Sequence, residues 1–360
     1  MTQTPPSAQT STQQAPSNNY PDPVLSAEEI RAWVSRARPV DKVEKLPGDA
    51  STRLYFRVQS GKESFVAMKM ESFAEVGARL PFLAVQKHLF DAGIDVPRIL
   101  GTLPEQGLML LEDLGDVTLL KRLQEVSSAD LERQLYERVI DGLVRFQVEC
   151  SPERKPAELD AFKLRFDVEK LMWEVNFTIE HFYQTYLKRE ITEPDLRLMH
   201  TFFTEICAIL AKQPTVLTHR DFHSRNVMVL HGEPWDRFVM IDFQDARLGP
   251  PQYDLASLLK DSYYQLEEAQ ITRLIDYYIA RWEAATGEPV DRARFIHVFD
   301  LMSVQRNFKA IGSFASFLNR RGNATYLKYI GNTFENIRRT LLKYPRYSDL
   351  REVLFHYYYF

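Results

Sequence analysis

Two short polar motifs between apolar runs restrict the fold of this chain more than any other feature. The first motif is the tripeptide His-Arg-Asp at residues 219–221, and Asn226 follows its aspartate by five positions. The second is Asp242, which comes directly after the apolar run at residues 238–241. Short apolar runs that end in polar motifs are typical of buried strands that carry functional loops. We therefore predict a hairpin that brings both aspartates and the asparagine together.

Two aspartates and an asparagine in this order suit phosphoryl transfer. One carboxylate must orient the attacking hydroxyl and accept its proton, and another must hold the magnesium ion that bridges the nucleotide phosphates. We assign Asp221 to the first role, and Asn226 and Asp242 to the second. A single aspartate is often only a cap or turn residue, but the order and spacing of both motifs match the catalytic segments of kinases. ATP and Mg²⁺ are the implied cofactors.

Apolar patterning divides the chain into a strand-rich first part and a helical second part. Strands are predicted at residues 43–46, 54–58, 64–70, 97–103 and 107–111. Helices are expected at residues 26–38 and 80–91, and helical periodicity dominates after residue 115. We expect an α+β, bilobal protein-kinase-like fold. Its N-lobe, a small antiparallel sheet, would span residues 25–113, and its larger, mainly helical C-lobe would span residues 114–360.

The composition argues against several other classes of protein. Residues 1–24 are rich in Thr, Gln, Ser and Pro, so this tail cannot bury enough apolar surface to fold and is expected to be disordered. No apolar run approaches the ~20 residues of a membrane helix, and no secretory signal is recognisable. The net charge of -4 argues against nucleic acid as a partner, and the two cysteines lack metal-binding spacing. A cytoplasmic monomer is expected.

Candidate nucleotide-binding residues lie in the strand-rich part. Lys69 ends the run Phe-Val-Ala-Met-Lys, which matches the kinase strand whose lysine contacts the α- and β-phosphates. Its partner is either Glu75 or Gln86, and the sequence does not decide between them. The loop at residues 48–53 has no GxGxxG pattern, but small and hydroxyl residues there can present backbone amides to phosphates. Further candidates are Ala50, Ser51 and Thr52 in this loop, and Glu112, Asp113 and Leu114, whose backbone would face adenine.

These segments together resemble the aminoglycoside-phosphotransferase / kinase-like superfamily. More narrowly, they resemble the bacterial anomeric N-acetylmuramate/N-acetylglucosamine kinases of cell-wall recycling. The resemblance covers about residues 40–320, and it rests on the segments 48–57, 111–115, 219–226, 241–250, 253–259 and 305–309. Thr52 and Leu54 depart from the Phe and Arg expected in the loop of that family, which affects substrate details more than the chemistry.

The resemblance implies transfer of the ATP γ-phosphate to the C1 hydroxyl of N-acetylmuramate or N-acetylglucosamine. Asp221 would be the catalytic base, Asn226 and Asp242 would be magnesium ligands, and Lys69 would bind phosphate. His223 stands two residues after the catalytic aspartate, where protein kinases carry a phosphate-contacting lysine.

Candidate acceptor residues follow from the chemistry of an acidic sugar. N-acetylmuramate carries a lactyl carboxylate, which a bidentate arginine would suit. Arg306 and Lys309 lie three residues apart on a predicted helix and share one face, and Arg225 lies beside the catalytic loop. Glu174, on another predicted helix, can accept hydrogen bonds from sugar hydroxyls or from the acetamide group. A solvated basic face is the alternative explanation of the three cations.

Two other functions stay open at this point. The first is a kinase of another small acceptor, such as an aminoglycoside, choline or another amino alcohol, which would require an acidic pocket in the C-lobe. The second is a pseudokinase that only binds ATP, although intact Lys69, Asp221, Asn226 and Asp242 argue against it. Asp254 is predicted to cap a helix that starts near it.

Overall fold

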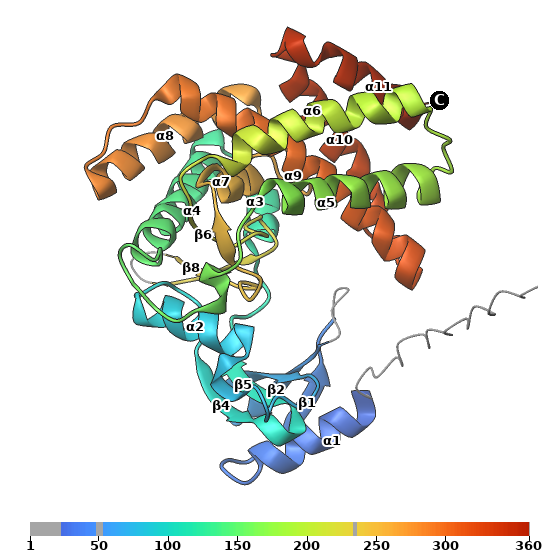
Figure 1. Ribbon diagram of the computed structural model, residues 1–360. Coiled ribbons are helices and arrows are strands. Elements are labelled where there is room, and N and C mark those ends of the chain that lie inside the picture. The colour runs from blue at the N-terminus through green and yellow to red at the C-terminus, as the bar shows by residue number, and fades with distance from the viewer. Residues whose placement is uncertain (1–22, 48–52, 233–235, 360) are drawn as a thin grey trace, which may run out of the picture. The chain divides into compact units, whose positions relative to one another are not determined.

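The computed structural model describes residues 23–47, 53–232 and 236–359 (Figure 1). Most of the tail that we expect to be disordered, and the loop candidates Ala50, Ser51 and Thr52, lie outside these residues. The chain forms two compact units. The first contains Met1–Ala74 and Leu100–Leu111, and the second contains Glu75–Ile99 and Glu112–Phe360. Within the described residues, every helix is too short or too polar to cross a membrane.

The first unit contains a five-stranded sheet in the order β1-β2-β3-β5-β4 (Figure 1). Its elements are α1 (Pro23–Val34), β1 (Lys42–Lys45), β2 (Leu54–Ser60), β3 (Glu63–Lys69), β4 (Ile99–Leu103), η2 (Pro104–Gln106) and β5 (Leu108–Glu112). Strands β2 and β3 pair antiparallel, with Ser60 opposite Glu63. Gly61 follows Ser60 with φ +59°, which the tight two-residue turn between these strands requires. All five predicted strands are therefore present, with small shifts of their ends.

Helix α1 covers one face of this sheet and builds the core of the unit. Ile30 and Val34 pack against apolar side chains from three strands: Phe56, Val58, Phe65, Ala67, Leu108 and Leu110. The predicted range of residues 26–38 for this helix is wrong, because α1 begins at Pro23 and ends at Val34. Proline is favoured in the first helical turn, where its missing N–H costs nothing. Ser26 is consequently a buried residue inside the helix.

The second unit is mainly helical, as predicted. Its α-helices are α2 (Pro81–Asp91), α3 (Leu119–Glu125), α4 (Ala129–Glu149), α5 (Val168–Thr178), α6 (Glu193–Ala211), α7 (Gln252–Leu259), α8 (Glu268–Thr286), α9 (Arg292–Arg321), α10 (Ile330–Leu342) and α11 (Ser348–Tyr359). Short helical segments are η1 (Gly77–Arg79), η3 (Asp160–Phe162), the π-helix η4 (Ile179–Tyr186), η5 (Leu327–Tyr329) and η6 (Pro345–Tyr347). A sheet-bearing unit followed by a helical one confirms the predicted α+β class.

Four short strands interrupt the helices where the two polar motifs occur. Strand β6 (Val216–Thr218) pairs antiparallel with β9 (Arg247–Gly249). Strand β7 (Val227–Leu230) pairs antiparallel with β8 (Arg237–Met240). Residues 219–226 therefore connect β6 to β7, and residues 241–246 connect β8 to β9, so that both polar motifs lie in the two loops that link one strand pair to the other.

Helix α9 packs closely against the helix formed by α5 and η4, and one glycine permits this approach. A Cβ atom added at Gly312 would lie 2.4 Å from Oγ1 and 2.7 Å from Cα of Thr178. The Thr178 hydroxyl also donates a hydrogen bond to the carbonyl oxygen of Phe308, at 2.9 Å. A side chain at Gly312 therefore clashes with backbone that has no room to move.

We expect Gly312→Ala to destabilise the protein by about 1–3 kcal/mol, the cost of overpacking a core. Alanine is the better helix former by about 1 kcal/mol, so the clash must exceed this gain. Gly142→Ala in α4 is the matched control, because the nearest atom to its added Cβ is 4.0 Å away. Urea denaturation of both variants should show a loss for Gly312→Ala and none for Gly142→Ala. If the two variants had equal free energies of unfolding, α9 and α5 could move apart to accept the added methyl group without a loss of stability.

Candidate active site

The loop between β6 and β7 holds the first motif in a strained conformation. Arg220 has φ +79°, and Asp242 in the loop after β8 has φ +67°. Positive φ is uncommon for residues other than glycine and costs about 1–3 kcal/mol, so the surrounding structure must hold it. Such positions concentrate at functional sites. The two loops are joined directly, since the Ile241 N–H donates to the Asn226 carbonyl oxygen at 3.0 Å.

The side chain of Asn226 lies between the two aspartates. Its Nδ2 donates to the backbone carbonyl of Asp221 at 2.9 Å and lies 3.5 Å from Oδ2 of Asp242. The other oxygen of Asp242, Oδ1, accepts a hydrogen bond from Gln244 at 2.7 Å. The structure therefore brings together three residues that the sequence places in separate motifs.

Two buried aspartates form hydrogen bonds with the loop at residues 219–226. Asp254 accepts hydrogen bonds from the backbone N–H groups of His219 and Arg220, at 2.8 and 3.0 Å. Burial raises the pKa of Asp254 to about 7, although these two donors act in the opposite direction. Asp261 accepts the backbone N–H and the hydroxyl of Ser224. The helix cap predicted at Asp254 is wrong, because α7 begins at Gln252 and the N–H groups that Asp254 binds belong to the loop. The role of Asp261 was not predicted, because no local pattern reveals such a long-range contact.

Cations surround Asp221. Lys309 Nζ of α9 lies 3.2 Å from its Oδ1, and both side chains are partly buried. Burial alone would raise the pKa of Asp221, but Lys309 and Arg220 hold it well below its usual range, with smaller effects of His223 and Arg306. Asp221 is therefore ionised at neutral pH.

His223 is a neutral imidazole in this environment. Burial lowers its pKa to about 3, and the charge of Arg306 acts in the same direction. Its ring packs edge-on against Tyr263, with 5.1 Å between ring centroids. This residue therefore cannot supply a positive charge to a phosphate at neutral pH, as a lysine would.

The neutral state of His223 predicts how stability changes with pH. Its pKa is about 3 in the folded chain and about 6.5 in an unfolded one, so unfolding binds a proton between these values. The free energy of unfolding then falls as the pH is lowered through this window. Between about pH 7 and about pH 5, His223→Gln should lose less of this free energy than the parent protein. Urea denaturation measures the difference, and an equal loss in both proteins would show that His223 titrates normally.

The remaining acceptor candidates lie near the same loop in different environments. Glu174 of α5 is 1% exposed, and its Oε1 lies 3.7 Å from Nη2 of Arg220. Gln305 donates to its other oxygen at 3.1 Å. The guanidinium of Arg225 lies over two aromatic rings, 4.9 Å from the centroid of Tyr263 and 5.3 Å from that of Tyr326. Arg306 is 5% exposed, and its Nη1 has no hydrogen-bond partner among the described residues.

The nucleotide candidates of the first unit make other contacts. Lys69 Nζ lies 2.6 Å from Oε2 of Glu29 in α1 and donates to the carbonyl oxygen of Gln106 at 2.7 Å. Glu29 was not considered in the sequence analysis, because α1 precedes the sheet and no motif links it to β3. Gln86, one of the two partners considered there, donates instead to the carbonyl oxygen of Pro97.

The predicted adenine link lies at the end of β5. The side chain of Glu112 forms ion pairs with Arg98 and with Arg237, each at 3.3 Å. Asp113 accepts the N–H of Gly115 at 3.0 Å, which closes a local turn, and Leu114 is buried. These side chains are engaged within the protein, so any contact with a base would come from the backbone.

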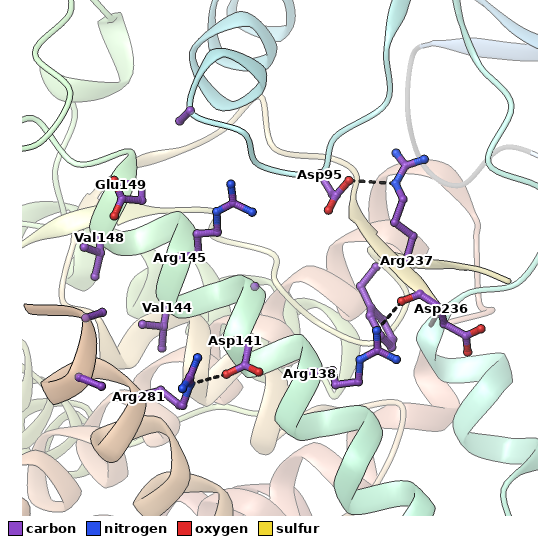
Figure 2. Close-up of a pocket in the computed structure, with 15 residues that line it drawn as sticks. Asp95, Arg138, Asp141, Val144, Arg145, Val148, Glu149, Asp236, Arg237 and Arg281 are labelled. Atoms are coloured by element: carbon purple, nitrogen blue, oxygen red, sulfur yellow. Dashed lines mark hydrogen bonds and ion pairs between the residues drawn. The ribbon is translucent and has the colours of Figure 1, made fainter. Parts of the chain in front are cut away.

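A cavity of about 940 Å³ lies elsewhere in the second unit, bordered by α4, β8, the end of α8 and the segment after α2 (Figure 2). Its charges largely neutralise one another: Arg281 pairs with Asp141 at 2.7 Å, and Arg237 pairs with Asp95 at 2.9 Å. None of the described residues that line this cavity is a predicted site residue. The candidate active site is therefore the region around the two polar loops.

The residues of these loops fit a magnesium ion. In the described part of the chain, no group of three or more His, Cys, Asp or Glu side chains is arranged to hold a metal. Magnesium needs no such group, because one or two protein oxygens, nucleotide phosphates and waters complete its shell. Asp242 offers a carboxylate, and the Asn226 amide, whose nitrogen bonds to the backbone, has its oxygen left for this purpose.

Comparison with known proteins identifies relatives of the chain. The phosphotransferase enzyme family matches residues 42–292. The N-acetylmuramate/N-acetylglucosamine kinase of Neisseria meningitidis serogroup B is 33% identical over 310 residues, 85% of this chain and 87% of that protein. The protein of the same name from Pseudomonas aeruginosa is 31% identical over 347 residues, 91% of this chain and 95% of that protein.

A solved structure shares the fold. The ADP-bound crystal structure of the aminoglycoside phosphotransferase APH(2'')-Ib superimposes with a TM-score of 0.57 at 15% identity, covering 86% of this chain and 97% of that one. This agrees with the predicted protein-kinase-like fold. Since the family match covers most of the chain and relatives above 30% identity extend over nearly its whole length, the chain belongs to the phosphotransferase enzyme family.

Proposed function

We propose that this protein is an ATP-dependent sugar kinase that transfers the γ-phosphate to the anomeric C1 hydroxyl of N-acetylmuramate, N-acetylglucosamine or both, in the recycling of cell-wall sugars. The observation that carries this proposal is the arrangement of Asp221, Asn226 and Asp242 around one amide. It occurs in a chain about one-third identical to two kinases named for these sugars.

In this proposal Asp221 orients the acceptor hydroxyl. Lys309 occupies Oδ1, and no described residue hydrogen-bonds to Oδ2, so Oδ2 is the oxygen available to accept the hydroxyl proton. As the sugar oxygen bonds to the γ-phosphorus, the bond to the β-phosphate oxygen breaks and the proton moves to the carboxylate. The low pKa of Asp221 makes it a weak base, which suits a loose transition state with late proton transfer.

The proposed ligands of the nucleotide and its metal are the residues of the kinase motifs. Asn226 and Asp242 would hold Mg²⁺, which neutralises phosphate charge when bound. We retain Lys69 as a proposed phosphate ligand, and its ammonium group would have to leave Glu29 to act. The loop residues Ala50, Ser51 and Thr52 would contact phosphates, and the backbone of Glu112, Asp113 and Leu114 would contact adenine. His223 would contribute to the same site as a neutral hydrogen-bonding group.

The charges near Asp221 favour a neutral or anionic acceptor over a cationic one. Lys309, Arg220 and Arg306 all influence this carboxylate, whereas Glu174 is already surrounded by Arg220 and Lys170. These cations would repel a cationic aminoglycoside or choline and attract an anionic acceptor. We therefore propose Arg225, Arg306, Lys309 and Glu174 as acceptor-site residues for an amino sugar. We also propose that the protein is a monomer and that it lies in the cytoplasm, where ATP is available.

The test is direct detection of the product. The purified protein with ATP and Mg²⁺ should convert N-acetylmuramate or N-acetylglucosamine into a sugar 1-phosphate, observed by ³¹P nuclear magnetic resonance and by loss of the reducing end. Kanamycin and choline serve as cationic acceptors for comparison. Phosphorylation of these cations alone would establish the alternative acceptor class. Binding of ATP without turnover of any acceptor would establish a pseudokinase.

A further inference from the structure

We propose that Arg306 is the receptor for the lactyl carboxylate of N-acetylmuramate, and thereby the residue that separates this sugar from N-acetylglucosamine. This inference rests on the proposed function and deepens it. The two sugars differ only by the lactyl ether on C3, so a residue that binds the carboxylate contributes to one acceptor and not to the other.

The first argument is the environment of Arg306 itself. The residue lies in the middle of α9 and is 5% exposed, yet its guanidinium forms no ion pair or hydrogen bond with any described residue, and its Nη1 is buried. A buried charged donor without an acceptor is unfavourable. The charge of Arg306 helps to lower the pKa of Asp221, Asp254 and Asp261, but no ion pair joins it to any of these three carboxylates. A bound carboxylate would supply the missing acceptor.

The second argument is that the neighbouring cations are already engaged. Lys309 pairs with Asp221 at 3.2 Å. Arg220 lies between Glu174 and Asp245, at 3.7 and 3.8 Å. Arg225 lies over the rings of Tyr263 and Tyr326. Of the three cations proposed for the acceptor site, Arg306 is therefore the one whose charge is not committed to another described group.

The third argument is position. Arg306 precedes Lys309 by three residues on α9, so both side chains leave the same face of the helix about 5–6 Å apart at Cβ. Because Lys309 contacts Asp221, Arg306 lies within one helical turn of the point where the acceptor hydroxyl must bind. The lactyl group is attached two ring atoms from C1, so a sugar with C1 at Asp221 carries its carboxylate close by. A guanidinium binds such a group through two parallel hydrogen bonds.

The test compares two variants of α9 with the two sugars. Arg306→Met keeps the length of the side chain but removes its charge, and kcat/KM for N-acetylmuramate should fall by about 10- to 100-fold, the scale of a lost charged hydrogen bond. For N-acetylglucosamine kcat/KM should fall by a smaller factor, so that the ratio of kcat/KM for N-acetylmuramate to that for N-acetylglucosamine drops by about 10-fold or more. Lys309→Met is the matched control, because it removes one charge from the same face of the helix, next to Asp221. It should lower kcat/KM for both sugars to a similar degree.

A second measurement changes the sugar instead of the protein, and is made on the parent and on Arg306→Met. The parent protein should use the carboxamide of N-acetylmuramate about 10-fold or more less efficiently than the acid, and Arg306→Met should not distinguish the two. Equal losses for both sugars in Arg306→Met, or no preference of the parent protein for the acid over its carboxamide, would overturn the inference. Turnover of neither sugar by the parent protein would instead overturn the proposed function, so the two failures are distinguishable.

Discussion

Asp242→Asn should lower kcat by about 10³-fold or more, because it removes the charge of the proposed magnesium ligand while the backbone keeps its conformation. Asp242 has φ +67°, a value that asparagine tolerates well among residues with a side chain. Asp242→Ala would remove the same ligand but would also add backbone strain of about 1–2 kcal/mol. The asparagine variant therefore separates the loss of the metal ligand from a loss of structure.

Steady-state turnover of N-acetylglucosamine with ATP and Mg²⁺ measures this effect. Asp276→Asn is a suitable control, since Asp276 lies on the surface of α8 and pairs with Arg292. A thermal unfolding curve should be similar for all three proteins without nucleotide. If Asp242→Asn retains full activity at all magnesium concentrations, this carboxylate does not hold the metal.

Asp221→Asn should lower kcat by about 10²- to 10⁴-fold, the range for a positioned acid or base. Asparagine occupies the same volume and still accepts the hydrogen bond from Lys309, so the geometry of the loop is expected to persist. It cannot take up the hydroxyl proton. Because proton transfer is expected to be late, the loss reflects positioning of the hydroxyl as much as basicity.

Nucleotide binding distinguishes this variant from a misfolded protein. Asp221→Asn should bind ATP with Mg²⁺ about as tightly as the parent, measured by isothermal titration calorimetry. KM for the sugar should change less than kcat. Full turnover by Asp221→Asn would assign the acceptor hydroxyl to a different carboxylate, and the proposed mechanism would be wrong.

The sequence predicted those parts of the site that depend on local pattern. The strands β6 to β8 are short apolar runs that alternate with polar loops. This pattern was enough to predict that the motifs of Asp221 and Asp242 lie close together. Four strands of the first unit were found because they contain β-branched or aromatic residues, and β5 was found as a short apolar run of Leu and Met that follows Gly107. The relatives and the family match agree with the function inferred from these motifs.

Contacts between distant segments could not be predicted in this way. Asp254 and Asp261 support the catalytic loop from 34 and 37 residues away. Glu29 reaches Lys69 across 40 residues, from a helix whose start was placed three residues too late. Such pairs depend on tertiary packing, which periodicity and motif spacing do not encode. The ion pairs of Arg220 and Lys309, and the packing of Arg225 on two aromatic rings, likewise could not be predicted, because their partners are distant in the sequence.

The first unit is assembled from two stretches of chain that are separated by Glu75–Ile99, and this has a consequence for synthesis on the ribosome. Strands β4 and β5 cannot join the nascent sheet until residues up to Glu112 have emerged, so a chain stopped at Ala74 would expose the unpaired edge of β3. Once Glu112 has emerged, all five strands of the sheet are available to pair, before most of the second unit has been translated. Arg306 and Lys309, the cations proposed for the acceptor site, are translated much later, on α9, so the sheet would be complete well before the proposed acceptor site could form.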